Sequence, residues 1–248
     1  EDCCTVFTPR HPRTRPKVAE VEAAESVMDV EALVEEARGL AASGVKELIV
    51  IAQDITRYGL DRKDGSTLAK LLDRLCELDF HWIRLHYLYP EAVTDELIET
   101  IARQPKILHY LDIPIQHCND AILKAMRRRN TRAEIEALFA KLRKAMPDVV
   151  LRTSLICGLP GEGGAEFEEL CHFLREQRIQ RAGVFQFSPE EGTLAAAMEG
   201  QVDPDTAALV PQPTQVTEAT GAVDVAAGTY QTACLLSDGT LLTWGAQR

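Results

Sequence analysis

Residues 156–162, with the sequence ICGLPGE, form the segment whose residue types are most specific for ligand binding. Glycine has no Cβ atom, so the backbone at Gly158 and Gly161 can approach a bound molecule closely. Glu162 lies where a helix is expected to begin, and a helix N-terminus attracts anions. A tight turn between a strand and a helix uses glycine and proline equally well, so that alternative stays open beside the favoured binding role.

Gln116 and His117 end an apolar segment, ILHYLDIPIQ at residues 107–116, which is expected to be a strand. Pro114 lacks a backbone N–H group, so this strand must be locally irregular. Both polar residues are then placed at the end of the strand, near the expected site. A single histidine without a second one at metal-ligand spacing is typical of a hydrogen-bonded structural residue rather than of a metal ligand.

Cys3 and Cys4 could be the remnant of a metal site, half of a disulfide, or neither. An odd number of cysteines without regular spacing argues against a disulfide framework and favours a reducing cytoplasm. Cys76 and Cys171 lie in helical apolar patterns, which favours core packing. The seven cysteines are residues 3, 4, 76, 118, 157, 171 and 234.

The net charge of −11 argues against nonspecific binding of duplex nucleic acid. A basic run, Arg127 to Arg129 with Arg132, is the local exception, and it fits an anion site or a solvated helix end equally well. The sequence has no apolar stretch of about 18 residues and no apolar region of a signal peptide near its start. We therefore expect a cytoplasmic globular protein without a membrane span.

The elements that must position these residues alternate between helix and strand. Between the expected strands, apolar residues recur at helical spacing and predict helices. Thr131 with Glu134 predicts a capping box at the start of one of these helices. Strict alternation predicts a parallel sheet covered by helices, here an open or partial (β/α) barrel of the α/β class, with ligands at the carboxyl ends of its strands. The five expected strands are 47–52, 82–89, 107–116, 149–157 and 182–187.

The helix–strand rhythm ends after Phe187. Prolines at 204, 211 and 213 indicate a linker over residues 199–214. Residues 222–245 predict two or three short strands around a turn at Asp238 and Gly239. The C-terminal region is thus expected to be a separate small β module.

Four segments together resemble the radical SAM methylthiotransferases, and the resemblance covers roughly residues 28–195. The sequence YLYP at residues 87–90 and the pair Gln116-His117 resemble the RimO-type branch, which modifies an aspartate of a small-subunit ribosomal protein. The branch that modifies transfer RNA usually differs at both places. The four segments are KELIVIAQDITRYG, RLHYLYPEAVTDELIETIA, ILHYLDIPIQHCNDAILKAMRR and the stretch from LRTSLICGLPGE to FEEL.

The resemblance implies an S-adenosylmethionine cofactor and a 4Fe-4S cluster held by a Cys-x3-Cys-x2-Cys loop. In this family the cofactor is cleaved reductively to a 5′-deoxyadenosyl radical, and a second cluster participates in sulfur insertion. The resemblance points to no catalytic side chain. The cofactor-binding residues that it implies by position are Gln116, Arg128, Ser154, Gly158 and Gly161.

Cys4 is the one implied cluster ligand in the sequence. The family continues with Cys-Thr-aromatic-Cys, and residues 4–7, CTVF, match this pattern until Phe7 replaces the cysteine. The first ligand would precede residue 1, and Cys3 has the wrong offset to replace it. We interpret residues 1–20 as a degenerate segment at the cluster-loop position, and we expect the chain as given not to hold the cluster.

The resemblance divides the rest of the chain into a radical SAM partial barrel at 21–198, the linker at 199–214 and a C-terminal fragment at 215–248. That fragment resembles one regulator-of-chromosome-condensation repeat, a propeller-type unit that cannot form a propeller alone. An unrelated terminal hairpin is the alternative. We find no counterpart of the family's auxiliary-cluster domain or of its TRAM domain.

The implied function is methylthiolation of a ribosomal-protein aspartate, with competence of this chain in question because of the incomplete cluster loop. A truncated or fused scaffold with an interaction module is the non-enzymatic alternative. Methylthiolation of transfer RNA is the third. The expected partner is a ribosomal protein, with no membrane and no strong nucleic-acid binding, and the oligomeric state stays open.

Overall fold

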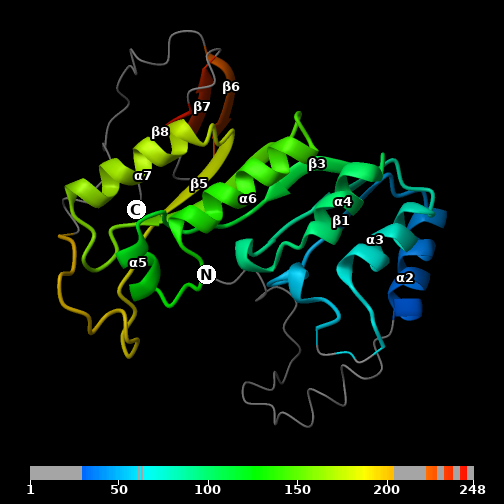
Figure 1. Cartoon of the computed structure of the whole chain (residues 1–248), viewed down its shortest axis with the longest axis horizontal. Helices are drawn as coiled ribbons and strands as arrows, with labels where there is room; N and C mark the ends of the chain where they lie inside the picture. The colour runs from blue at the N-terminus through cyan, green and yellow to red at the C-terminus, as the bar shows by residue number, and fades with distance from the viewer. Residues whose placement is uncertain are drawn as a thin grey trace.

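Five parallel strands form one sheet in the order β1-β2-β3-β4-β5, so each strand pairs with its neighbour in sequence (Figure 1). The computed structural model describes residues 30–60, 62, 64–203, 222–227, 232–236 and 241–244. The prediction of five parallel strands with helices between them is confirmed. The strands are β1 (Glu47–Val50), β2 (Trp82–Leu85), β3 (Ile107–Asp112), β4 (Val150–Cys157) and β5 (Arg181–Gln186).

Helices connect the strands, and several of them have a capping side chain at the N-terminus. Thr94 accepts a hydrogen bond from the Leu97 N–H, and Thr131 with Glu134 forms the expected capping box. Such caps satisfy backbone N–H groups that have no partner within the helix. The helices are α2 (Val30–Ala42), η2 (Ile55–Arg57), α3 (Leu68–Cys76), η3 (Pro90–Ala92), α4 (Asp95–Arg103), α5 (Asp120–Ala125), α6 (Arg132–Ala145) and α7 (Gly164–Glu176).

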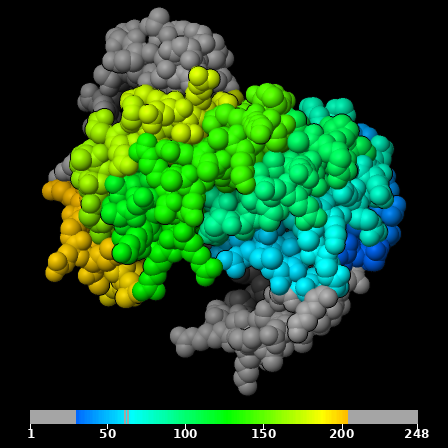
Figure 2. All heavy atoms as spheres, in the orientation of Figure 1, coloured from blue at the N-terminus to red at the C-terminus, as the bar shows by residue number. Residues whose placement is uncertain are grey.

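One face of the sheet is covered by helices, and we call it the outer face. Figure 1 shows α3, α4, α6 and α7 side by side over the strands, and Figure 2 shows their side chains as a continuous surface. Leu85, Leu111 and Leu155 of the sheet are at most 1% exposed on this face. Phe139 of α6 and Phe173 of α7 pack against one another over them, with ring centroids 6.4 Å apart. Burial of this apolar surface is the main contribution to the stability of the domain.

The opposite face, the inner face, carries the alternate residues of each strand. Side chains of consecutive strand residues point to opposite faces, and the register places the alternate residues of neighbouring strands together. The inner face is mixed in character, with exposed apolar side chains beside charged ones. Its residues include Glu47, Ile49, Arg84, Tyr110, Asp112, Arg152, Ser154, Gly183 and Phe185.

The strands β1, β2 and β3 end earlier than the sequence predicts, and β1 ends at Val50 instead of residue 52. β2 ends at Leu85 instead of residue 89, and Tyr87 beyond it has a left-handed φ of 60°. β3 ends at Asp112, although the Ile113 N–H still donates to the Arg152 carbonyl oxygen at 2.8 Å, and Gln116 then forms an isolated parallel bridge with Leu155. The irregularity expected at Pro114 is therefore present, because proline has no N–H group to donate to the neighbouring strand.

The C-terminal strands form a separate antiparallel sheet. β6 (Ala222–Ala227), β7 (Thr232–Leu236) and β8 (Leu241–Trp244) pair in sequence order, which confirms the predicted strands. The turn residues Asp238 and Gly239 lie outside the described residues, as do 1–29 and most of the predicted linker. The comparison of this module with a propeller repeat therefore stays a prediction.

Candidate functional site

The backbone of Gln116 joins the ends of β3 and β4. Its N–H group donates to the Ser154 carbonyl oxygen at 2.9 Å, and its own carbonyl accepts from the Ile156 N–H at 2.9 Å. Its φ of 69° lies in the left-handed region, which costs about 1 kcal/mol or more for a residue with a Cβ atom. The two hydrogen bonds stabilise this conformation and place Gln116 beside Ser154. This agrees with the expectation that polar residues meet at the carboxyl ends of neighbouring strands.

Arg128, which follows α5, contacts the segment between the end of β3 and Gln116. Its Nη2 donates to the Pro114 carbonyl oxygen at 2.7 Å, and its guanidinium lies 4.8 Å from the ring centroid of Tyr89. Its Nε is buried and has no hydrogen-bond partner among the described residues. A buried N–H group without a partner is costly, so this position suits a ligand that brings an acceptor. Three segments that follow β2, β3 and α5 thus meet near Gln116.

The turn after β4 is held by Glu162, which is 8% exposed. Its Oε2 accepts from the Gly158 N–H at 2.7 Å and from the Leu159 N–H at 3.1 Å, while the Gly161 N–H donates to the Gly200 carbonyl oxygen. Gly158 and Gly161 have φ values of 81° and 83°, which favour glycine. The turn alternative therefore explains both glycines and occupies their N–H groups, and their part in cofactor binding stays a prediction.

His117 is buried and hydrogen-bonded within the protein, which agrees with the structural role predicted for it. It is fully buried, and its Nδ1 accepts a hydrogen bond from the Asn119 N–H at 2.9 Å. The proton then lies on Nε2, 3.7 Å from Glu162 Oε1. His117 is therefore bonded to the start of α5, while its buried Nε2 has no hydrogen-bond partner among the described residues.

A network of charged side chains crosses the inner face. Arg84 donates to Glu47 at 2.6 Å and lies 4.9 Å from the ring centroid of Tyr110. Further along the sheet, Asp112 Oδ1 accepts from Arg152 Nη1 at 2.7 Å, and the same Nη1 donates to Ser154 Oγ at 2.8 Å. Ser154 thus contacts this network through its hydroxyl group and Gln116 through its backbone carbonyl oxygen.

Asp112 is the most buried member of the network, with 0% of its surface exposed. Its Oδ2 has no hydrogen-bond partner within the described part of the chain, although His86 Nδ1 lies 3.4 Å away. A buried carboxylate needs a cation or hydrogen-bond donors nearby, since an isolated one is expensive to desolvate. Asp112 is therefore held between His86 and Arg152.

Sequence reasoning missed His86, Asp112 and Arg152. A signal was present, because each is an ionisable residue at an alternate position of an otherwise apolar strand. That pattern indicates a strand whose second face is not covered by helices. Which of these residues touch one another depends on the register between strands, which the sequence does not determine.

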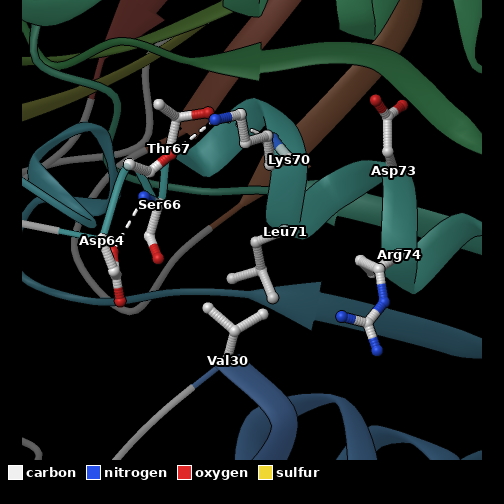
Figure 3. A pocket seen from close by; sticks show the side chains of 9 residues that line it. Val30, Asp64, Ser66, Thr67, Lys70, Leu71, Asp73 and Arg74 are labelled. Carbon is white, nitrogen blue, oxygen red and sulfur yellow. Dashed lines mark hydrogen bonds between the residues drawn. The ribbon is translucent and has the colours of Figure 1, made fainter.

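A hollow of about 440 Å³ lies elsewhere, beside the N-terminal turn of α3 (Figure 3). Val30 and Leu71 face each other across it, and Lys70 Nζ donates to the Gly65 carbonyl oxygen at 2.6 Å. Arg74 at its rim is paired with Glu31 at 2.7 Å. The charged side chains that line this hollow already have partners within the protein, so none of them is left to bind a ligand.

The described residues contain no group of three side chains that could hold a metal ion. Cys76, Cys118, Cys157 and Cys171 are free, and burial raises the pKa of Cys76 to about 11 and of Cys118 and Cys157 to about 12. Such thiols stay protonated at neutral pH, whereas cluster iron binds thiolates. Cys4, the predicted ligand, lies outside the described residues, so the described part of the chain does not by itself fit a cluster.

The fold is an α/β partial barrel whose polar groups gather at the carboxyl ends of its strands. The family model of the radical SAM superfamily matches residues 9–174. The chain belongs to this superfamily. No helix among the described residues is long and apolar enough to span a membrane.

Curated relatives narrow the comparison. Over 174 residues the chain is 54% identical to the ribosomal protein uS12 methylthiotransferase RimO of Pelobacter propionicus, covering 70% of this chain and 39% of the relative. It is 52% identical to the protein of the same name from Lachnoclostridium phytofermentans, covering 70% and 40%. The chain thus spans about two fifths of the length of these relatives.

Solved structures include Streptococcus suis SuiB bound to S-adenosylmethionine. It shows 14% identity and a TM-score of 0.48, over 71% of this chain and 36% of that one.

Proposed function

We propose that the chain is the core of a methylthiotransferase that modifies an aspartate of ribosomal protein uS12. The observation that carries the proposal is the 54% identity over 174 residues to a protein named for that activity. The residues at the strand edge support it, because the motif residues Gln116, Arg128 and Ser154 come together there. The target residue type follows from the family resemblance.

The strand edge fits S-adenosylmethionine in its chemistry. Arg128 offers a buried Nε without a partner, which suits the carboxylate of the cofactor's amino-acid part. The Ser154 hydroxyl accepts from Arg152 and keeps its own proton to donate to a ribose oxygen. Gln116 is half-buried beside it, and Gly158 and Gly161 add no side chain at the end of β4. When bound, S-adenosylmethionine would supply the 5′-deoxyadenosyl radical on reductive cleavage.

Cys4 is the one residue that the family resemblance implies as a ligand of the iron–sulfur cluster, and we expect the chain as given not to hold the cluster. No set of ligands for it exists among the described residues, and we derive no step through it. What the described residues can do is bind and orient: Gln116, Arg128 and Ser154 hold the cofactor, and the inner face receives the substrate.

A protein substrate is favoured over transfer RNA. The net charge of −11 disfavours a polyanionic partner, because binding of nucleic acid depends on neutralising phosphates with basic side chains. The curated relatives named above are ribosomal-protein enzymes. The non-catalytic scaffold is the remaining alternative, and a binding test separates it from the core of an enzyme.

The test measures binding of two probes by fluorescence anisotropy. We expect a labelled uS12 peptide that carries the target aspartate to bind saturably, with S-adenosylhomocysteine tightening the complex. A labelled transfer RNA at the same ionic strength should not bind. Binding of transfer RNA without binding of the peptide would favour the transfer-RNA alternative, and binding of neither probe nor S-adenosylhomocysteine would favour the scaffold.

A further inference from the structure

Arg152 combines a fixed position with donors that the protein does not use. It lies on β4, and its Nη1 donates to both Asp112 Oδ1 and Ser154 Oγ, at 2.7 and 2.8 Å. Among the described residues no acceptor is bonded to its Nε or Nη2. Solvent reaches 26% of the side chain. The two hydrogen bonds thus fix Nη1, whereas the Nε–H and Nη2–H groups, which form one edge of the guanidinium, can donate to a ligand.

Two neighbours make this position specific for an arginine. Gly183 on β5 has no side chain, and a Cβ atom there would lie 3.2 Å from Arg152 Nη2, so the glycine leaves space for the guanidinium. Asp112 is fixed in turn, because it is fully buried and His86 Nδ1 lies 3.4 Å from its Oδ2. A guanidinium held in this way loses little conformational entropy when it binds a ligand.

The Nε–Nη2 edge of Arg152 matches the geometry of a carboxylate. Nε–H and Nη2–H are parallel donors, and the two oxygens of a carboxylate accept from such a pair with matching geometry. An amide presents only one oxygen and repels the second donor with its own NH2 group. The edge therefore distinguishes an aspartate from an asparagine. It also lies next to Ser154, one of the residues proposed to hold the cofactor.

We propose that the Nε–Nη2 edge of Arg152 binds the side-chain carboxylate of the aspartate that is modified. This inference rests on the proposed function and names the residue that selects its target. Asp112 and Ser154 act as positioning residues, which fix the guanidinium and do not touch the substrate. The binding places the target residue on the inner face, beside the carboxyl ends of β3 and β4.

The test compares a uS12 peptide that carries the target aspartate with the same peptide carrying asparagine, both bound in the presence of S-adenosylhomocysteine. The wild-type chain should prefer the aspartate peptide by about 10-fold or more, the value of a charged hydrogen-bonded pair. Arg152→Gln should bind both peptides with equal affinity. Arg84→Gln, an arginine of the same face that is already paired with Glu47, is the matched control and should keep the preference.

A preference undiminished in Arg152→Gln would overturn this inference alone. Failure of the wild-type chain to bind either peptide would overturn the proposed function together with it. If Arg152→Gln does not fold, because Asp112 then stays buried without its cation, Arg152→Lys decides: a preference reduced several-fold supports the proposal. A preference equal to that of wild type in Arg152→Lys would show that the two-donor edge has no role.

Discussion

The outer and inner faces of the same five strands are built from opposite chemistry. Leu85, Leu111 and Leu155 on the outer face are almost completely buried under helices. On the inner face, Arg152 and Asp112 form an ion pair, and Phe185 is 53% exposed. Apolar burial gives the outer face its stability, whereas the inner face holds polar groups in fixed positions. We expect substitutions on the outer face to change stability and substitutions on the inner face to change binding.

The largest expected effect comes from a buried aromatic side chain. Phe173→Ala should lower the free energy of unfolding by about 3–5 kcal/mol, because it removes a fully buried ring and leaves a cavity. Phe185→Ala on the inner face is the matched control and should change it by about 0.5 kcal/mol or less. Urea denaturation followed by circular dichroism measures both. Equal losses for the two variants would show that the inner face is packed as tightly as the outer one.

The turn after β4 should give the next effect. Glu162→Ala leaves the N–H groups of Gly158 and Leu159 without their acceptor, and a buried unsatisfied group costs about 1–3 kcal/mol. Glu166→Ala is the control, since that carboxylate also accepts a backbone hydrogen bond, from Gly163, but in an exposed position. The same urea titration compares them. A Glu166 variant less stable than the Glu162 variant would contradict the structural role given to Glu162.

A substitution of Gln116 should weaken cofactor binding while changing the stability of the fold only slightly. Gln116→Gly removes the strain of a left-handed φ but adds freedom to the unfolded chain, so the free energy of unfolding should change by about 1 kcal/mol or less. Binding of S-adenosylhomocysteine, measured by calorimetry, should weaken several-fold, because the amide side chain is lost. A variant that binds as tightly as wild type would remove Gln116 from the proposed cofactor site.

The smallest effect is expected in the helical layer, at Glu169. Hydrogen bonds from Asn119 Nδ2 and Arg132 Nη1 lower the pKa of this carboxyl below its ordinary value. The stability that it contributes is therefore present above the unfolded-state pKa and is lost as the pH falls through the lower folded-state pKa. Glu169→Gln should melt below wild type at pH 7 and match it in strong acid. A melting difference independent of pH would assign the effect to packing.

The outer face was predictable from sequence, and the inner face was not. Apolar periodicity and caps such as Thr131 determine where helices and strands form, because they act over a few residues. The lengths of β1, β2 and β3 were overestimated, and in β2 and β3 the apolar run continues past an irregular position, the left-handed Tyr87 or Pro114. Contacts between distant strands depend on register, which is why the pairing of Asp112 with Arg152 was missed.

The residues of the candidate site were also predictable from the sequence only in part. Gln116, Arg128 and Ser154 were identified by resemblance, and the structure brings their segments together at one strand edge. The roles of Gly158 and Gly161 could not be separated from the needs of the turn. The hydrogen bonds of Glu162 to this turn became visible only in three dimensions.

The central claim, that the carboxyl ends of β3 and β4 form a cofactor site, is tested most directly by NMR. The ¹⁵N-labelled chain is titrated with S-adenosylhomocysteine, whose affinity without cluster iron we expect near 1 mM, about −4 kcal/mol. The account predicts shifts of the amide signals of Gln116, Ser154 and Gly158, with the signals of Lys70 and Arg74 at the α3 hollow unchanged. Shifts confined to the α3 hollow, or no shifts at millimolar ligand, would contradict it.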